Sequence, residues 1–72
     1  MINVKEAKKK AQEYIEDTDL KIGDCMDDGE YFIFGFTEEV DFSPIGVNKK
    51  TGEVIDYFPP DHPKFIDAIE IE

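Results

Sequence analysis

Three side chains in this sequence belong to the types that catalyse acyl transfer or hydrolysis: the only cysteine, Cys25, the only serine, Ser43, and the only histidine, His62. Either Asp24 or Asp61 could orient the imidazole, so a nucleophile, a base and an orienting carboxylate are all present. Each also has a simpler interpretation, because a cysteine near a turn is usually a small hydrophobe and a histidine between prolines usually a loop residue. We favour the simpler interpretation and expect no catalysis.

The segment DCMDDGE, which begins at Asp24, has the spacing of the start of a calcium-binding loop. Asp24, Asp28 and Gly29 take the first, fifth and sixth positions of such a loop. Met26 stands at the third position, however, and Gly35 stands where the closing glutamate is needed. We therefore interpret the segment as an acidic turn with Gly29 at a positive φ. One histidine and one cysteine cannot build a closed transition-metal site, so we expect no metal and no other cofactor.

Length and charge limit the remaining classes of function. The chain has 72 residues, with 18 acidic residues against 8 lysines and no arginine, and its formal net charge is −10. A domain of this size gains only about 3–5 kcal/mol from a single core, and no deep substrate cleft fits within it. Its field repels nucleic acid and anionic membranes but attracts basic proteins, so we expect a protein partner, no nucleic acid and no membrane. A single cysteine and the lack of a signal-like or membrane-spanning apolar run favour a cytoplasmic location.

The N-terminal part of the chain predicts a helix. Asn3 and Glu6 have the spacing of a capping box, and apolar residues then recur at helical intervals. We expect this helix to run from about residue 4 to about residue 17. Its apolar stripe consists of Val4, Ala7, Ala11, Tyr14 and Ile15.

The following residues alternate with the period of β-strands. Residues 20–25 place Leu20 and Ile22 on one face and Gly23 and Cys25 on the other, before an Asp-Gly turn. The next strand, EYFIFGFT, has a face of three phenylalanines that we expect to pack against the helix. Its two faces are Phe32, Phe34 and Phe36 on one side, and Tyr31, Ile33 and Gly35 on the other.

A hairpin and a terminal element complete the predicted fold. Ile45 and Val47 alternate in a third strand, the Thr-Gly turn places Gly52 at a positive φ, and residues 53–58 return as a fourth strand. Prolines then stop the strand. We expect a short helix after them, although the alternation in residues 68–71 also fits a fifth strand. The predicted fold is α+β: one domain with an N-terminal helix packed on a four-stranded antiparallel meander, followed by a short C-terminal helix.

The sequence SPIGVNKKTGEVIDYFPPDHPKFIDAIE, residues 43–70, resembles the C-terminal half of the immunity protein 35 family. These are small bacterial domains found beside polymorphic toxins, in which a proline and an aliphatic strand lead into a Lys-Thr-Gly-Glu hairpin. The chain lacks the family's central-strand tryptophan and its Gly-rich approach to Pro44. More broadly, the hairpin resembles PepSY-like domains and other half-cystatin folds. The resemblance implies toxin immunity, with an accessory or structural module, including a homodimeric one, as the alternative.

The second face of the predicted sheet has no obvious cover, because the helix packs on only one side. Its aromatic and aliphatic side chains, including Tyr57 or Phe58 from the fourth strand, would form an apolar surface rimmed by charge. We expect this surface to bind a partner, either a basic protein such as a toxin or a second copy of the chain. The alternative is that a homodimer or the terminal segment covers the face. The predicted partner-binding residues are Tyr31, Ile33, Tyr57, Glu38, Glu39 and Asp41.

Overall fold

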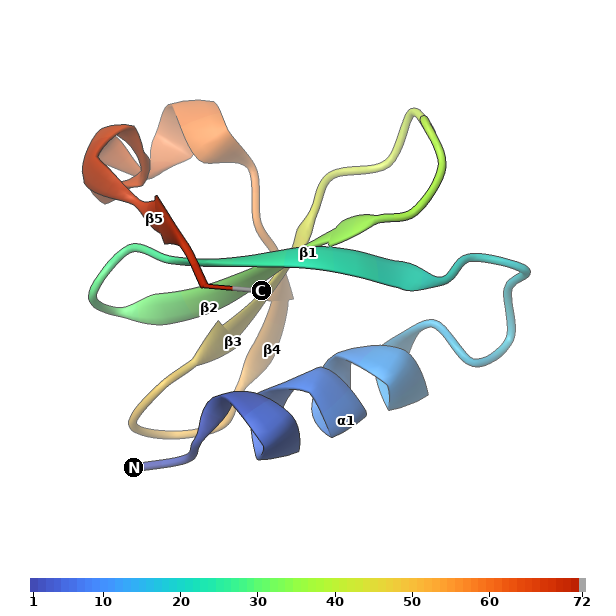
Figure 1. Ribbon diagram of the computed structural model, residues 1–72, viewed down its shortest axis with the longest axis horizontal. Coiled ribbons are helices and arrows are strands. Elements are labelled where there is room, and N and C mark those ends of the chain that lie inside the picture. Colours follow the sequence, from blue (N-terminus) through green and yellow to red (C-terminus); the bar gives the residue numbers. More distant parts are fainter. Residues whose placement is uncertain (72) are drawn as a thin grey trace.

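The computed structural model describes residues 1–71, which form one α-helix, a five-stranded antiparallel sheet and two 3-10 turns (Figure 1). The predicted α+β class and the packing of the N-terminal helix on the sheet are confirmed, but the sheet has five strands where four are predicted. The strand order is β4-β3-β2-β1-β5. The elements are α1 (Val4–Tyr14), β1 (Ile22–Asp27), β2 (Tyr31–Phe36), β3 (Ile45–Asn48), β4 (Val54–Asp56), the turns η1 (Pro59–Asp61) and η2 (Pro63–Asp67), and β5 (Ile69–Glu70).

Helix α1 begins where the capping residue predicts and ends earlier than its apolar pattern predicts. The Asn3 side-chain oxygen accepts a hydrogen bond from the Glu6 backbone N–H at 2.8 Å. The helix ends at Tyr14 because the Thr18 side chain forms hydrogen bonds with the backbone that follows. Its hydroxyl donates to the Ile15 carbonyl at 2.7 Å and accepts from the Leu20 N–H at 3.1 Å. These local bonds replace a last helical turn.

The core lies between α1 and the phenylalanine face of β2, as predicted. Ala7 and Ala11 are fully buried, and their small side chains let the helix approach the sheet closely. Phe34 lies at the centre of this contact with none of its surface exposed. Tyr14 departs from the predicted stripe, because it is half exposed and donates its hydroxyl to the Asp56 carboxylate at 3.2 Å.

Strand β1 contains a bulge that changes which of its residues face the core. Ile22 pairs with Phe36 while Cys25 pairs with Phe34, so two residues of β1 stand opposite one residue of β2. The predicted alternation of Cys25 with Ile22 is therefore wrong, since both pack into the same core. Gly23 permits the close approach, because a Cβ there would lie 2.9 Å from the Phe36 backbone.

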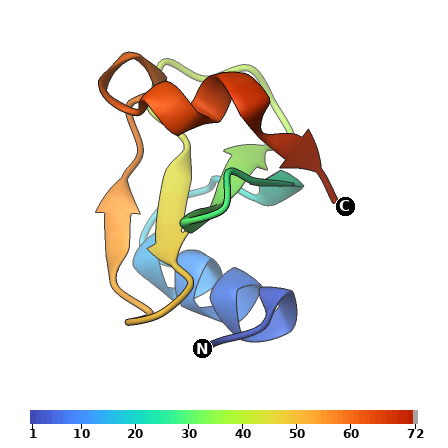
Figure 2. The same ribbon diagram turned by 90° about the vertical axis from the view of Figure 1, so that its left-hand side faces the viewer.

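The C-terminal segment covers the second face of the sheet, on the side opposite α1 (Figure 2). Of the two alternatives that the sequence leaves for this face, the structure has the one in which the terminal segment covers it: Ile33 is 2% exposed and Tyr57 is fully buried. The segment forms η1 and η2 followed by β5 instead of a short α-helix, because the backbone becomes extended at Ala68 (φ −65°, ψ 144°) where β5 pairs with β1, which leaves only Pro63–Asp67 for helical turns. Strand β5 then pairs with β1 at Met26 and Asp27. No helix within residues 1–71 has both the length and the apolar character needed to cross a bilayer.

Candidate functional site

The fold separates the side chains whose types suggest catalysis. Cys25 is buried in the core on the α1 side of the sheet. His62 lies on the other side, stacked on the Tyr57 ring. Ser43 belongs to the loop between β2 and β3. The structure therefore keeps Cys25 and His62 on opposite sides of the sheet, so these two residues do not form the nucleophile–base contact that such catalysis requires.

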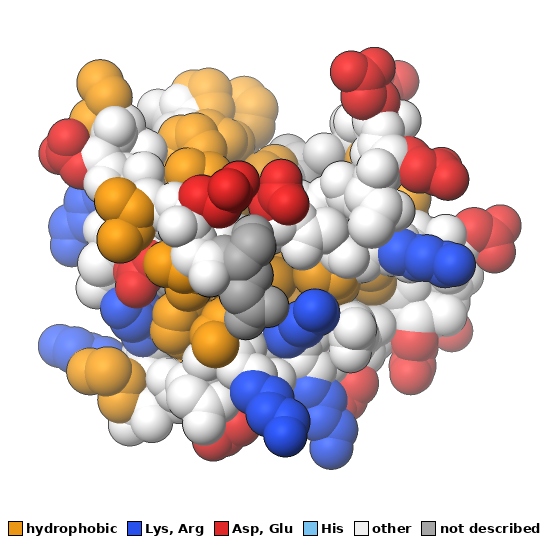
Figure 3. Space-filling view, viewed as in Figure 1, with side chains coloured by type: hydrophobic (Ala, Val, Ile, Leu, Met, Phe, Trp, Pro, Cys, Tyr) orange, Lys and Arg blue, Asp and Glu red, His pale blue; other side chains and the backbone are white. Residues whose placement is uncertain are grey.

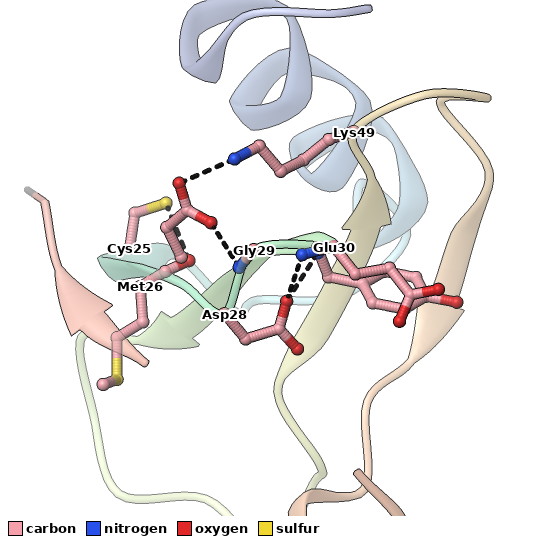
Figure 4. Close-up of polar contacts among 8 residues, drawn as sticks. Cys25, Met26, Asp28, Gly29, Glu30 and Lys49 are labelled. Carbon is pink, nitrogen blue, oxygen red and sulfur yellow. Dashed lines mark hydrogen bonds and ion pairs between the residues drawn. The ribbon is translucent and has the colours of Figure 1, made fainter. Parts of the chain in front are cut away.

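Asp27, at the start of the β1–β2 turn, uses both carboxylate oxygens in contacts within the chain, with Gly29 and Lys49. Both partners are labelled in Figure 4. One oxygen accepts the Gly29 N–H at 2.7 Å, and the other accepts Lys49 Nζ at 2.8 Å. Gly29 has φ +95°, which confirms the predicted positive φ in this turn. The same Lys49 ammonium lies 5.1 Å from the centre of the Phe32 ring.

Both carboxylate oxygens of Asp28 also accept hydrogen bonds from within the chain. Its Oδ1 accepts backbone N–H groups from Glu30 and Tyr31 at 2.8 and 2.7 Å, and its Oδ2 accepts the Tyr57 hydroxyl at 2.6 Å. Asp24, which would be the first ligand of a calcium loop, is exposed. Within the described residues, no three His, Cys, Asp or Glu side chains are grouped so that they could hold a metal ion. The carboxylates of this turn are used to build the fold.

A cluster of rings holds the C-terminal segment on the sheet. The His62 ring stacks on Tyr57 with centroids 4.0 Å apart and an interplanar angle of 14°. Tyr31 meets both rings edge-on at 5.7 Å, and Phe65 packs against Tyr57 at 5.8 Å. We call Asp28 and these four rings the terminal clamp. Of the predicted partner-binding residues, Tyr31 and Tyr57 belong to the clamp, and Ile33 is buried on the same face.

The bond between Tyr57 and Asp28 shifts the pKa of both groups. Burial, reinforced by the bond to Asp28 and by the nearby carboxylates, raises the pKa of Tyr57 well above 10.0. Burial alone would raise the pKa of Asp28, but the hydrogen bonds from Tyr57 and from two backbone N–H groups, with the charge of Lys64, outweigh it. The pKa of Asp28 is therefore held below 3.8.

Tyr57→Phe should destabilise the fold by about 1–3 kcal/mol, because it removes the hydrogen bond from a buried hydroxyl to the half-buried Asp28 carboxylate while keeping the ring. The depressed pKa of Asp28 contributes stability that is present above pH 3.8 and lost as the pH falls below it. The raised pKa of Tyr57 contributes stability that is present below pH 10.0 and lost as the pH rises above it. Urea unfolding from pH 3 to pH 11 measures how the free energy of unfolding of the wild type and of Tyr57→Phe depends on pH.

In the variant, the stability difference from the wild type should be largest between these limits and shrink on the acid side. The matched control is Tyr14→Phe, which removes an exposed hydrogen bond to Asp56 and should cost less than about 1 kcal/mol. Equal losses in the two variants would contradict the role assigned to the terminal clamp.

The remaining predicted partner-binding residues lie together on an exposed loop. Glu38, Glu39 and Asp41 are all exposed, and they belong to the loop that projects from the sheet between β2 and β3 (Figure 1). We call residues 37–44 the acidic loop. In the space-filling view, carboxylates gather at the tip of this projection, at the upper right (Figure 3). The structure thus divides the six predicted residues into a buried or half-buried aromatic and aliphatic group and an exposed acidic group.

Sequence reasoning missed Phe42, the aromatic residue of the acidic loop. Its side chain is 66% exposed, and it follows Asp41 directly. The sequence does contain a sign that Phe42 is exposed: it lies outside the alternating pattern of either neighbouring strand and next to acidic residues. A second exposed aromatic, Phe58 at 52%, flanks the same end of the sheet, where the Tyr57 N–H donates to the Pro44 carbonyl at 2.8 Å. Exposed aromatic area beside charge is typical of protein-binding surfaces.

Comparisons of the chain with family models, with curated proteins and with solved structures find no match. The resemblance of residues 43–70 to the immunity protein 35 family stays a prediction, and the candidate site is defined by geometry alone.

Proposed function

We propose that this domain binds a basic protein through the acidic loop and catalyses no reaction. The observation that carries the proposal is Phe42, a large apolar side chain that is 66% exposed on a loop with three exposed carboxylates. An aromatic anchor supplies contact area that holds a partner, while carboxylates around it orient and attract a positively charged surface. The formal net charge of −10 extends that attraction beyond the loop.

Toxin immunity is the specific form of this function that the sequence resemblance implies. A small acidic domain would neutralise a basic toxin by covering part of its surface, which requires no chemistry. A second copy of the chain is a poorer partner for the acidic loop, because two such loops repel each other. Nor is a second copy needed to cover the sheet, since the C-terminal segment does so.

The test begins with the product of the reading frame next to this chain's own. Expressing that product alone and together with the chain, and measuring growth, tests immunity; biosensor kinetics with the purified pair test binding. Binding without restored growth would contradict immunity while leaving the binding proposal in place. An absence of binding to any basic neighbour product, with no growth protection, would contradict both.

Neutralising the acidic loop should slow capture of the basic partner. The triple variant Glu38→Gln, Glu39→Gln, Asp41→Asn should lower the association rate constant by about tenfold at low salt and flatten its salt dependence. The dissociation rate constant should change less, because these exposed charges act mainly on approach. Phe42→Ala should have the complementary effect and raise the dissociation rate constant about tenfold.

A matched triple variant separates the loop from the overall charge. Glu13→Gln, Asp17→Asn, Glu53→Gln removes the same number of charges from exposed positions outside the acidic loop. It should lower the association rate constant by no more than about twofold, because local charges dominate steering once salt screens the distant ones. If the two triple variants slow association equally, net charge alone attracts the partner and the acidic loop is not the binding site.

A further inference from the structure

A groove lies between α1 and the connection that leads from it to β1, residues 15–21. Its volume is about 410 Å³, and its apolar floor consists of Ile15, Leu20 and Ile22. In the space-filling view an apolar strip runs between α1 and β1 (Figure 3). Leu20 and Ile22 are only partly buried, so apolar surface remains in contact with solvent here. Apolar area of this kind can contribute to a protein interface.

The groove continues to the base of the acidic loop. Thr37, the first residue of that loop, lines the groove, and its N–H donates to the Lys21 carbonyl at 3.0 Å. A hollow of about 190 Å³ adjoins the groove, shares Leu20, Lys21 and Thr37 with it, and is also lined by Phe36 and Glu38. The acidic loop and the connection between α1 and β1 lie at the same end of the molecule (Figure 1). A protein bound to the acidic loop therefore has this apolar surface beside it.

Charge is nearly balanced in the groove and the hollow. Among the described residues that line them, the cations are Lys8 and Lys21, and the carboxylates are Glu16, Asp19 and Glu38. Two of the three carboxylates line the hollow, which is the part next to the acidic loop. A ligand would therefore make mainly apolar contacts with the groove and would meet acidic charge on the side of the loop.

The acidic loop alone is too small to form a stable protein interface. It consists of residues 37–44, whereas a stable interface takes about 20–30 residues and about 800 Å² from each partner. Such interfaces also have an apolar centre inside a polar rim. The groove and the hollow supply further residues and apolar area, and they adjoin the acidic loop directly.

We propose that the basic protein bound by the acidic loop also places apolar side chains in this groove, so that the loop and the groove form one continuous binding surface. This inference rests on the proposed function, because it concerns the same partner. It requires that partner to carry an apolar segment next to the basic residues that meet the carboxylates of the loop. Leu20 is the apolar residue that lines both the groove and the hollow, so it should lie within the contact.

Leucine-methyl NMR tests this contact directly, because Leu20 is the only leucine of the chain. The full chain with isotope-labelled leucine methyl groups is mixed with the unlabelled basic product of the neighbouring reading frame. In the complex, the Leu20 methyl groups should show nuclear Overhauser effects to aliphatic protons of that product. A complex in which they show none would overturn the inference.

Biosensor kinetics with the same product measure what the groove contributes. Leu20→Ala should raise the dissociation rate constant about fivefold and change the association rate constant less than about twofold, because lost apolar contact acts after encounter. The matched control is Ile2→Ala, which removes an isomeric side chain that is also partly buried against the core and lines neither the groove nor the hollow. It should change either rate constant by less than about twofold. Circular dichroism of each variant ensures that folded proteins are compared.

The outcomes separate this inference from the proposed function. If neutralising the acidic loop slows association but Leu20→Ala dissociates like Ile2→Ala, the loop binds the partner without the groove, and only this inference is overturned. If Leu20→Ala dissociates faster while the loop variant has no effect, the continuous surface is overturned. If the wild-type chain binds no basic product, the proposed function is contradicted and this inference with it.

Discussion

Phe34→Ala should leave this chain largely unfolded at room temperature. Phe34 has no exposed surface, and it packs in the core cluster with the two alanines of α1 and with Ile45 and Val47 of β3. Truncating such a side chain removes its transfer free energy and opens a cavity, at a cost of about 3–5 kcal/mol. A single core in a domain of this length supplies about the same amount. The mutation should therefore remove most of the free energy of unfolding.

Phe42→Ala is the matched control, since the same side chain is removed from a position that is 66% exposed. It should change the free energy of unfolding by less than about 0.5 kcal/mol. Circular dichroism during urea and thermal unfolding measures both variants. If Phe34→Ala stays folded and loses no more free energy of unfolding than Phe42→Ala, the helix does not pack on the phenylalanine face of β2.

The features that the sequence predicts correctly are those decided by neighbouring residues. Asn3 caps α1 by bonding a group three residues away, and the alternation of β2 sorts its phenylalanines onto one face without information from elsewhere in the chain. Gly29 and Gly52 have φ values of +95° and +77°, because turn chemistry requires them locally. Helix, strands and turns of this kind can be located from short patterns.

The features that cannot be predicted from the sequence depend on contacts between distant segments of the chain. The bulge at Gly23 shifts the pattern of β1 by one residue, and only its pairing with β2 reveals this. The side of the sheet that the C-terminal segment covers is decided by the contacts of Tyr57 with Asp28 and His62, which no periodicity encodes. An alternating strand looks the same whether its second face meets solvent or a later segment.

The predicted partner-binding residues also fall into a group whose exposure is decided locally and a group whose burial is decided by distant contacts. The three carboxylates of the acidic loop are exposed, because charged residues between strands seldom have partners inside a small domain. The apolar half of the predicted surface is buried, since the terminal clamp covers it. The large exposed aromatic side chain next to the carboxylates is instead Phe42. It is exposed because the loop that carries it runs away from the sheet (Figure 1).

Ile33→Glu should also unfold the chain, and this result decides whether the second face is covered in solution. Ile33 is 2% exposed between the sheet and the C-terminal segment. A carboxylate placed there would lose its hydration. Burial of an unpaired charge costs several kcal/mol, comparable with the stability that a domain of this length possesses. If the face were open, the same substitution would leave the fold intact.

Gly35→Glu provides a control on the same strand and the same face. A Cβ at Gly35 would meet nothing within 4 Å, and its backbone φ is not positive, so a side chain there reaches open space. The variant carries the same added charge as Ile33→Glu and should stay folded, within about 1 kcal/mol of the wild type. Thermal and urea unfolding of the pair compare a covered and an uncovered position two residues apart. If both variants stay folded, the C-terminal segment leaves the sheet in solution, and Tyr31, Ile33 and Tyr57 become accessible to a partner as the sequence alone predicts.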